Sequence, residues 1–520
     1  MIKKESILRG STITIAFNVI SKTIGFLSSL LIAYYFGANF QTDVFYFTSS
    51  FIALVSIIII SQQTTVFMPL FINIRNTVSE IEAWKFANTL FTLTIIISAL
   101  FGILFYLFGS NILLKISNFK QDVIIQTSNY IKYFAVIFFL MSIVEFMRAI
   151  IQSYSQFTLP ALAALANSVL MIICIVFFGR RIGVESMAIA IMFSYIVQAI
   201  LMLIYLKSKI KYFKIEFNKS PYLKGFVKLG VPVFIAQIFG SLSMFFYDFT
   251  SSLFDGGTLT SLSYGQRIAD IPNLMIIVPL ATVIVPAFSK LRTKNDNNLL
   301  EYYYKHNNFL WFLIIPISTL LIVLSFPIIK IFYLRGNFTI ESAAIAKDSL
   351  IYYSVSLIGA AFVAINTRLI YSIQKTKLIS LSSIVVGILS MILTYFMGKY
   401  IGYIGIPVSR SISLIFLSLP IGIFLSYHYF TDFKLSRIFI PLSKMICLSF
   451  VGALITYVIC NFVQIKFESS SILLSFFEIA EGTIIYSSIY FLGSSFLKLE
   501  QFYDLRKLFL KFKSKLLINK

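Results

Sequence analysis

Long runs of apolar residues, separated by short polar stretches, follow one another along almost the whole of this 520-residue chain. A membrane-spanning helix needs about 20 predominantly apolar residues, and a window of about that size finds roughly fourteen such segments here. The predicted spans cover residues 10–36, 43–74, 84–113, 126–154, 159–179, 185–206, 226–254, 258–288, 307–333, 342–370, 377–400, 404–427, 438–461 and 470–497. The pattern predicts an all-α polytopic membrane protein.

The composition agrees with this fold class and argues against several kinds of functional site. Hydrophobic residues make up 58% of the chain and charged residues 12%, and the mean hydropathy is +0.89. The three cysteines lie in apolar runs without the spacing of metal ligands, and the two histidines lie near predicted helix ends. We therefore expect no disulfide framework, no zinc site, no histidine-based catalysis and no cofactor.

The net charge of +22 comes mainly from lysines and arginines that flank the spans. They concentrate between the sixth and seventh spans and in the tail "KLEQFYDLRKLFLKFKSKLLINK", which places both termini in the cytoplasm by the positive-inside rule. Contact with anionic lipid headgroups explains basic residues at these positions. Nucleic-acid binding is therefore not expected.

The second and eighth spans resemble each other. "YFGANFQTDVFYF" precedes "TTVFMPLF" in one, and "LFDGGTLTSLSYG" precedes "ATVIVPAF" in the other, at nearly the same interval. Six spans separate the copies, and an even number preserves direction across the membrane, so the two halves should be parallel repeats, as in transporters. The predicted organisation is a six-helix lobe at 1–215, a second lobe at 216–430, two extra helices at 431–498 and a basic tail at 499–520.

We assign four basic residues to the spans themselves rather than to the loops and span ends: Lys22, Arg148, Arg267 and Arg410. Charge at bilayer depth is costly and normally faces the bundle interior or a wet cavity. Arg267 and Lys22 both lie about 15 Å deep, near the centre of a hydrocarbon core of about 30 Å. The alternative to a role in a cavity is pairing within one helix, because residues three apart share a helix face.

Two pairs have this spacing. For Glu145 and Arg148 we favour pairing within the helix, whereas for Arg267, three residues before Asp270, we favour a role in a cavity. Two cations at mid-depth, Lys22 and Arg267, indicate an anionic cargo or partner. Pro272, Pro279 and Pro286 recur every seven residues and should interrupt the eighth span, as in helices that line transport pathways.

Three stretches carry a specific resemblance: "SKTIGFLSSLLIAYYFGANFQTDVFYF", "DFTSSLFDGGTLTSLSYGQRIADIP" with the following "VPLATVIVPAFSKL", and "FPIIKIFYLRGNFT". They resemble the lipid II flippase family (MurJ, also called MviN), of the multidrug/oligosaccharidyl-lipid/polysaccharide exporter superfamily, over the first twelve spans. The resemblance implies fourteen helices, two six-helix lobes around a cationic cavity, and a groove at the last two helices for a lipid tail. It also implies an undecaprenyl-pyrophosphate-linked saccharide as cargo, carried from the inner to the outer leaflet of the bacterial cytoplasmic membrane.

Individual residues match the family's motifs. Lys22 falls where the family usually has an arginine, Asp43 matches the aspartate of its "T-D-x-F" motif, and Arg267 with Asp270 matches the charged residues of its eighth helix. Asp248 matches an aspartate linked in the family to sodium. The polar partners expected in the eleventh span fall on Ser390 and Thr394, and arginines expected in the first and second spans are replaced by Ser28 and the apolar residues around Ser56.

The resemblance and the residues together favour a lipid-linked saccharide flippase, for lipid II or a related cell-envelope precursor, that works as a monomer. We expect membrane lipids as partners and consider cell-envelope synthesis enzymes as further ones. The alternatives are a small-molecule or drug antiporter of the same superfamily and a membrane-embedded glycan ligase or polymerase. Short outer loops without acidic clusters argue against the enzyme. Because the sodium constellation is incomplete, we expect coupling to the membrane potential rather than to sodium.

Overall fold

The computed structural model of the protein describes residues 7–207, 212–215, 220–292, 296–373, 375–466, 472–507 and 510. Within these ranges the chain forms helices and connecting turns, with no β-strand. The chain divides into two compact units, Met1–Thr260 with Gly336–Phe338, and Ser261–Arg335 with Thr339–Lys520. The predicted all-α fold class is therefore confirmed, whereas the predicted lobe boundary at residue 215 stays a prediction.

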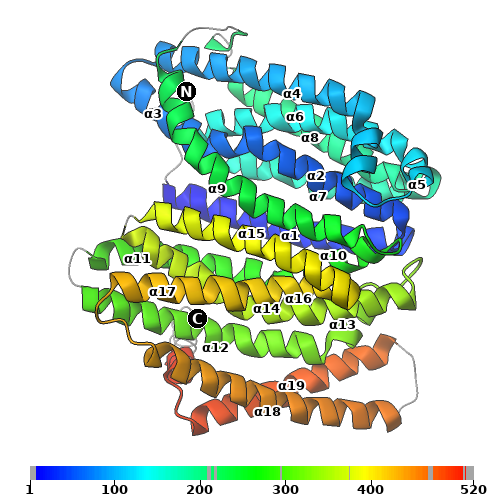
Figure 1. The fold of residues 1–520 in the computed structure, drawn as a ribbon, viewed down its shortest axis with the longest axis vertical. Helices are drawn as coiled ribbons and strands as arrows, with labels where there is room; N and C mark the ends of the chain where they lie inside the picture. Colours follow the sequence, from blue (N-terminus) through cyan, green and yellow to red (C-terminus); the bar gives the residue numbers. More distant parts are fainter. Residues whose placement is uncertain are drawn as a thin grey trace, which may run out of the picture. The chain divides into compact units, whose positions relative to one another are not determined.

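The first unit contains long helices that pack along their length, with α4 on α6, α6 on α8, and α7 between α1 and α8 (Figure 1). α2 packs on α6 and α9. The helices are α1 (Ile7–Phe36), α2 (Phe40–Gln62), α3 (Met68–Thr77), α4 (Glu80–Ile116), α5 (Gln121–Gln126), α6 (Ser128–Ser153), α7 (Thr158–Ile182), α8 (Glu185–Leu206) and α9 (Tyr222–Ser251).

The second unit is built around α14, which contacts α11, α12, α13, α16 and α17. α18 packs on α12, and α19 packs on α13 and α18, at the bottom of Figure 1. The helices are α11 (Val278–Arg292), α12 (Asp296–Val323), α13 (Ser325–Phe332), α14 (Ile340–Ser372), α15 (Thr376–Ile401), α16 (Gly405–Ile412), α17 (Leu419–Tyr429), α18 (Ser436–Lys466) and α19 (Ile472–Phe496). α10 (Thr258–Pro272) begins in the first unit and continues into the second.

Buried tryptophans lie at the centre of each unit's core. In the first unit, Trp84 stacks on Tyr212 and its indole Nε1 donates to the hydroxyl of Tyr154 at 3.0 Å. In the second, Trp311 stacks on Phe362 and its indole donates to the carbonyl of Ile358 at 3.0 Å. Each indole buries a large apolar ring and still satisfies its N–H, which fixes the packing of the helices around it.

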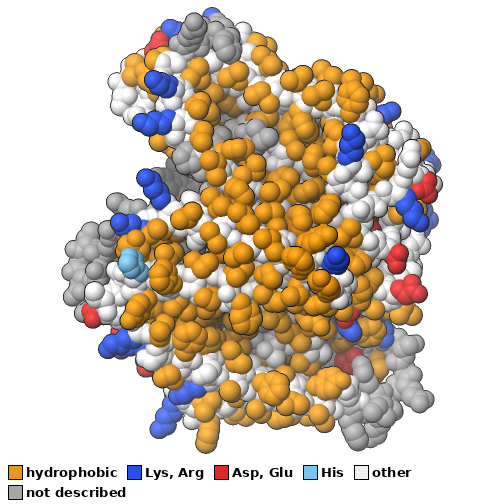
Figure 2. Space-filling model, in the orientation of Figure 1, with side chains coloured by type: hydrophobic (Ala, Val, Ile, Leu, Met, Phe, Trp, Pro, Cys, Tyr) orange, Lys and Arg blue, Asp and Glu red, His pale blue; other side chains and the backbone are white. Residues whose placement is uncertain are grey.

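The surface of the helices is mostly apolar. Figure 2 shows hydrophobic side chains over most of one face, with the lysine, arginine, aspartate and glutamate side chains gathered mainly near the helix ends. Exposed Leu, Ile, Phe and Val side chains are numerous along the long helices of both units. Such a surface is stable in hydrocarbon and not in water, so it identifies the faces that contact lipid.

Twelve helical segments of the described chain are long and apolar enough to cross a membrane. Two differences separate this set from the fourteen predicted spans. One candidate, Lys377–Tyr429, contains both the eleventh and the twelfth predicted spans, and α9, which covers the seventh, is a 30-residue helix outside the set. The order of the predicted spans therefore holds, while the number fourteen is approximate.

Three helices are interrupted by short π-helical segments: Gln63–Phe67, Asn273–Ile277 and Ser413–Ser418. Each segment ends two residues before a proline, namely Pro69, Pro279 and Pro420. Proline has no N–H to donate to the carbonyl four residues earlier, so the backbone at that point departs from the α pattern. The predicted interruption of the eighth span is confirmed, since α10 ends at Pro272 and α11 begins at Val278.

Topology is our first prediction. Reporter fusions after Lys219 and after Lys520, both outside the described residues, should report a cytoplasmic location because basic residues concentrate on either side of them. Paired phosphatase and fluorescent-protein reporters give opposite signals on the two sides of the membrane and check each other. If the phosphatase were active and the fluorescent protein dark at either site, that site would lie on the outer side of the membrane and the predicted orientation would be wrong.

Candidate functional site

Asp43 lies in the first turn of α2 and is buried, with only 2% of its surface exposed. Its carboxylate accepts hydrogen bonds from the backbone N–H of Gly257 at 2.6 Å and of Thr260 at 2.8 Å. Gly257 directly precedes α10 and Thr260 lies in its first turn, where a helix has no internal acceptors for its donors and favours negative charge. Asp43 therefore caps a helix that is more than two hundred residues away in sequence.

Gly257 makes this contact possible. Its φ of +96° is unfavourable for residues with a side chain, and a Cβ on it would lie 2.5 Å from the carbonyl oxygen of Ala38. A second bond joins the same elements, because the hydroxyl of Thr260 donates to the hydroxyl of Thr42 at 3.0 Å. The turn before α10 is thus held closely against the start of α2.

Glu145 and Arg148 form the expected pair on α6, with Nη1 of Arg148 2.7 Å from Oε1 of Glu145. Arg148 also donates to Oε1 of Gln198 on α8 at 3.2 Å. Both charges are mostly buried, with 15% and 23% of the side chains exposed. The pair therefore neutralises itself within the helix and links α6 to α8, which favours a structural role over a role in binding cargo.

Lys22 lies on the exposed side of α1. The other side of α1 is attached to α7 by Ser168, whose hydroxyl donates to the carbonyl of Ser21 at 3.1 Å and whose carbonyl accepts from the hydroxyl of Ser28 at 3.3 Å. No ion pair joins Lys22 to any residue that the structure describes. Its ammonium group is thus positioned to meet a ligand or lipid rather than a carboxylate of the same unit.

The residues of the predicted sodium site fall in different units. Asp248, on α9 in the first unit, accepts a hydrogen bond from Ser50 on α2. In the second unit, the buried Thr394 hydroxyl donates to the carbonyl of Ser390 at 2.7 Å and lies 2.9 Å from the hydroxyl of Ser409. Among the described residues, no group of three or more acidic, histidine or cysteine side chains could hold a metal ion.

Asp270 on α10 forms its ion pair with Arg410 on α16, with Nη2 of Arg410 3.3 Å from Oδ1 of Asp270, and not with Arg267. Gln266 donates to the other carboxylate oxygen at 3.4 Å, and the guanidinium of Arg410 lies 5.1 Å from the ring centre of Tyr353. Arg267, one turn before Asp270, is partly buried. Asp270 therefore compensates the charge of Arg410, on another helix of the second unit.

The Asp270–Arg410 pair lies beside two of the helix interruptions. Asp270 comes three residues before the π-helical segment Asn273–Ile277, and Arg410 comes three residues before Ser413–Ser418. The pair thus joins two broken helices of the second unit close to the points where they depart from the α pattern. π-helical segments of this kind are often found at functional sites.

Known proteins of one family are similar to this chain over most of its length. The family model described as "Lipid II flippase MurJ" matches residues 32–477, most of the chain. The chain belongs to the lipid II flippase MurJ family. A probable lipid II flippase MurJ of Buchnera aphidicola subsp. Baizongia pistaciae is 26% identical over 413 residues, covering 76% of this chain and 78% of the relative. Another, of Borreliella burgdorferi, is 24% identical over 404 residues, with the same coverage.

Solved structures support the same fold. A MurJ structure in an inward closed conformation has a TM-score of 0.77 at 21% identity and covers 95% of this chain and 100% of its own. An inward-facing multidrug resistance MATE transporter of the MOP superfamily has a TM-score of 0.66 at 17% identity, with coverage of 79% and 94%. The predicted resemblance to the MurJ family is confirmed by the family model and the relatives, and the solved structures show the same fold. The family consists of lipid II flippases, so the chain is a transporter rather than an enzyme.

The sequence did not identify Arg410 as the partner of Asp270. Arg410 appeared among the four in-span basic residues, but the only partner considered for Asp270 was Arg267, three residues away on the same helix. The roles predicted for Lys22, Arg267, Asp270, Asp43 and Asp248 stay predictions.

Proposed function

We propose that the chain carries lipid II, an undecaprenyl-pyrophosphate-linked saccharide, from the inner to the outer leaflet of the bacterial cytoplasmic membrane by alternating access. The match to the MurJ family model over residues 32–477 is the observation that carries this proposal. The cationic residues within the spans agree with it, because a pyrophosphate dianion can cross hydrocarbon only where positive charge compensates it.

Arg267 is the residue that we assign to the pyrophosphate. A guanidinium can donate two parallel hydrogen bonds to a phosphate, whereas an ammonium offers a point charge. Arg267 lies on α10, one turn before Asp270, which pairs with Arg410. Lys22, exposed on α1 of the first unit, is a second in-span cation available to an anionic cargo. Asp43 would act at the outer end of the pathway, where it holds the start of α10.

Replacement of the resident flippase tests the proposal. Expression of the chain in bacteria depleted of their own lipid II flippase should restore growth and the appearance of lipid II in the outer leaflet. The flipped lipid can be measured by its accessibility to an externally added enzyme. Lysis of the cells despite normal membrane abundance of the chain would contradict lipid II as cargo. Increased resistance to cationic drugs without rescue would favour the antiporter instead.

Coupling to an ion is our second prediction. The hydroxyl of Thr394 already bonds to Ser390 and Ser409, and Asp248 accepts from Ser50, so these side chains do not form a ready-made set of sodium ligands. We expect replacement of sodium by choline to leave flipping in vesicles almost unchanged, and dissipation of the membrane potential to slow it. Strong sodium stimulation that disappears in Asp248→Asn would show that this expectation is wrong.

We propose further that the chain acts as a monomer, with both termini in the cytoplasm. The basic tail and the basic segment between α8 and α9 would contact anionic lipid headgroups there. Enzymes that make or use lipid II are the protein partners to test first, since the cargo passes between them and the flippase.

A further inference from the structure

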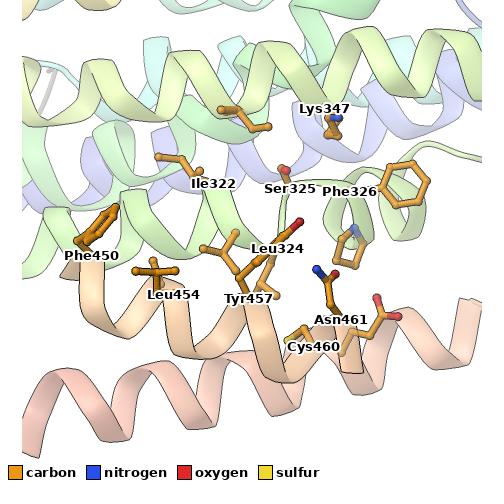
Figure 3. A pocket seen from close by; sticks show the side chains of 15 residues that line it. Ile322, Leu324, Ser325, Phe326, Lys347, Phe450, Leu454, Tyr457, Cys460 and Asn461 are labelled. Atoms are coloured by element: carbon orange, nitrogen blue, oxygen red, sulfur yellow. The ribbon is translucent and has the colours of Figure 1, made fainter. Parts of the chain in front are cut away.

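A pocket of about 460 Å³ lies in the second unit, between α18 and α19 on one side and α12, α13 and α14 on the other (Figure 3). Its size is within the range of small-molecule sites. Several of its lining side chains on α18 are well exposed, including Phe450, Leu454 and Tyr457. Because α18 is a candidate membrane span, a pocket with such a rim opens toward lipid rather than toward water.

The pocket is apolar at one end and polar at the other. Figure 3 shows Phe450, Leu454 and Ile322 at one end, and Lys347 and Asn461 at the other. Phe450 and Asn461 are about 16 Å apart along α18 at 1.5 Å per residue. The pocket is therefore elongated along the helix, with an apolar part that could hold an acyl chain and a polar part that could hold a headgroup.

The polar end of the pocket lies near the N-termini of α14 and α19 and near the C-terminus of α18. Lys347 is in the second turn of α14, Glu478 is in the second turn of α19, and Asn461 is in the last turns of α18. The predicted topology places these helix ends at the outer face of the membrane. Phospholipid headgroups meet the hydrocarbon core at this depth, so the polarity of the pocket matches the polarity of an outer-leaflet lipid.

Glu478 is the most informative residue of the pocket. It is 95% buried, with 5% of its surface exposed, yet the described residues offer its carboxylate neither an ion pair nor a hydrogen bond. The nearby Lys347 ammonium lies 3.3 Å from the carboxylate of Asp348, which also accepts from the hydroxyl of Tyr403. Burying a carboxylate without a partner in a membrane span is unfavourable in free energy. A cationic group of a ligand beside Glu478 would compensate its charge.

We propose that this pocket binds one phospholipid whose headgroup carries both a phosphate and a primary ammonium, such as phosphatidylethanolamine. The ammonium donates to Glu478, Lys347 and Asn461 face the phosphate, and one acyl chain lies along Leu454 and Phe450. An inorganic cation would need more carboxylate or other ligands than Glu478 alone provides, and a soluble amine would leave the apolar end unfilled. The lipid stabilises the packing of α18 and α19 on the rest of the unit.

The competing occupant is a polyprenyl tail. It would use the apolar end but leave Glu478 without a cation, so its binding would not depend on that residue. This difference allows the two occupants to be distinguished by headgroup and by a single substitution, without any measurement of transport.

Native mass spectrometry of the full chain tests the proposal. The purified, delipidated protein is exposed to an equimolar mixture of phosphatidylethanolamine, phosphatidylcholine, phosphatidylglycerol and undecaprenyl phosphate, and the retained lipids are counted. We expect phosphatidylethanolamine to exceed phosphatidylglycerol by about tenfold, the effect of one hydrogen bond to a charged group. Glu478→Gln should bring the two lipids close to parity, while Glu481→Gln, three residues along α19 and outside the pocket lining, should keep the preference.

Leu454→Trp provides a second variant that leaves the charges intact. Because Leu454 is 49% exposed, a larger side chain there fills the apolar end without disturbing a packed core, and it should reduce retention of phosphatidylethanolamine by about tenfold. A preference for phosphatidylethanolamine that survives Glu478→Gln would overturn the proposal. Retention of undecaprenyl phosphate over every phospholipid would also overturn it, as would wild-type retention by a folded Leu454→Trp variant.

Discussion

Arg267→Ala should lower the rate of lipid II flipping by about a hundredfold or more while the variant still inserts and folds. The reason is the loss of a bidentate contact to the pyrophosphate, since each hydrogen bond to a charged group contributes about 1.5–3 kcal/mol. Asp270 keeps its ion pair with Arg410, so removal of Arg267 does not leave that carboxylate unpaired. Flipping in reconstituted vesicles, normalised to folded protein measured by gel filtration, checks the prediction.

Two variants serve as controls for charge and for structure. Arg267→Lys keeps the charge but loses the fork of donors, so it should restore only part of the activity. Asp270→Ala removes the carboxylate that pairs with Arg410, whose side chain is 16% exposed, and should mainly reduce the amount of folded protein. If Arg267→Ala flipped lipid II at the wild-type rate, the proposed contact with the pyrophosphate would be wrong.

The fold was predictable because membrane insertion depends on local properties of the sequence. A run of about 20 apolar residues must satisfy its own backbone hydrogen bonds in lipid, and a helix is the simplest structure that does so. The interruption before Pro279 was predictable for the same reason, since the effect of a proline is confined to the preceding turn. Pro69 and Pro420 lie in the first turn of α3 and of α17, each just after a π-helical segment, and act in the same way. No interruption was predicted at these two prolines, although each offers the same signal as Pro279.

The charged residues show where local reasoning stops. Glu145 and Arg148 were expected to pair, and they do, because three residues separate them on one helix. Asp270 has a partner at the same spacing but pairs instead with Arg410, which is 140 residues away. Spacing along a helix indicates which side chains can meet, but tertiary packing decides which of them do, and a single sequence contains no information on contacts between distant helices.

Asp43 illustrates the same limit for a buried residue. The sequence places an acidic residue in the first turn of α2, where it would ordinarily stabilise the N-terminus of its own helix. Instead its two oxygens accept from Gly257, just before α10, and from Thr260 in the first turn of α10. The pair Gly256–Gly257 is the hint in the sequence that another element approaches closely at this turn, and Gly257 has a backbone conformation that most residues cannot adopt.

Asp43→Ala should therefore destabilise the first unit by about 3 kcal/mol or more and abolish flipping. The substitution leaves the N–H groups of Gly257 and Thr260 without acceptors in a buried position, and each lost bond to a charged acceptor costs about 1.5–3 kcal/mol. Asp43→Asn keeps one acceptor oxygen but places an amide N–H₂ against the second donor, so it should have an intermediate effect. Thermal unfolding of the purified variants in detergent measures the loss of stability.

Asp122 offers a matched control for Asp43. It too lies in the first turn of a helix, α5, but it is exposed, and its replacement by alanine should change stability by less than about 1 kcal/mol. The comparison separates loss of negative charge from loss of the cap on α10. A variant Asp43→Ala that is as stable as Asp122→Ala would show that the two hydrogen bonds to the turn contribute little. If Asp43→Ala is stable but unable to flip lipid II, Asp43 acts in the transport cycle. The hydrogen bonds from Asp43 to the start of α10 would then be needed for the conformational change and not for folding.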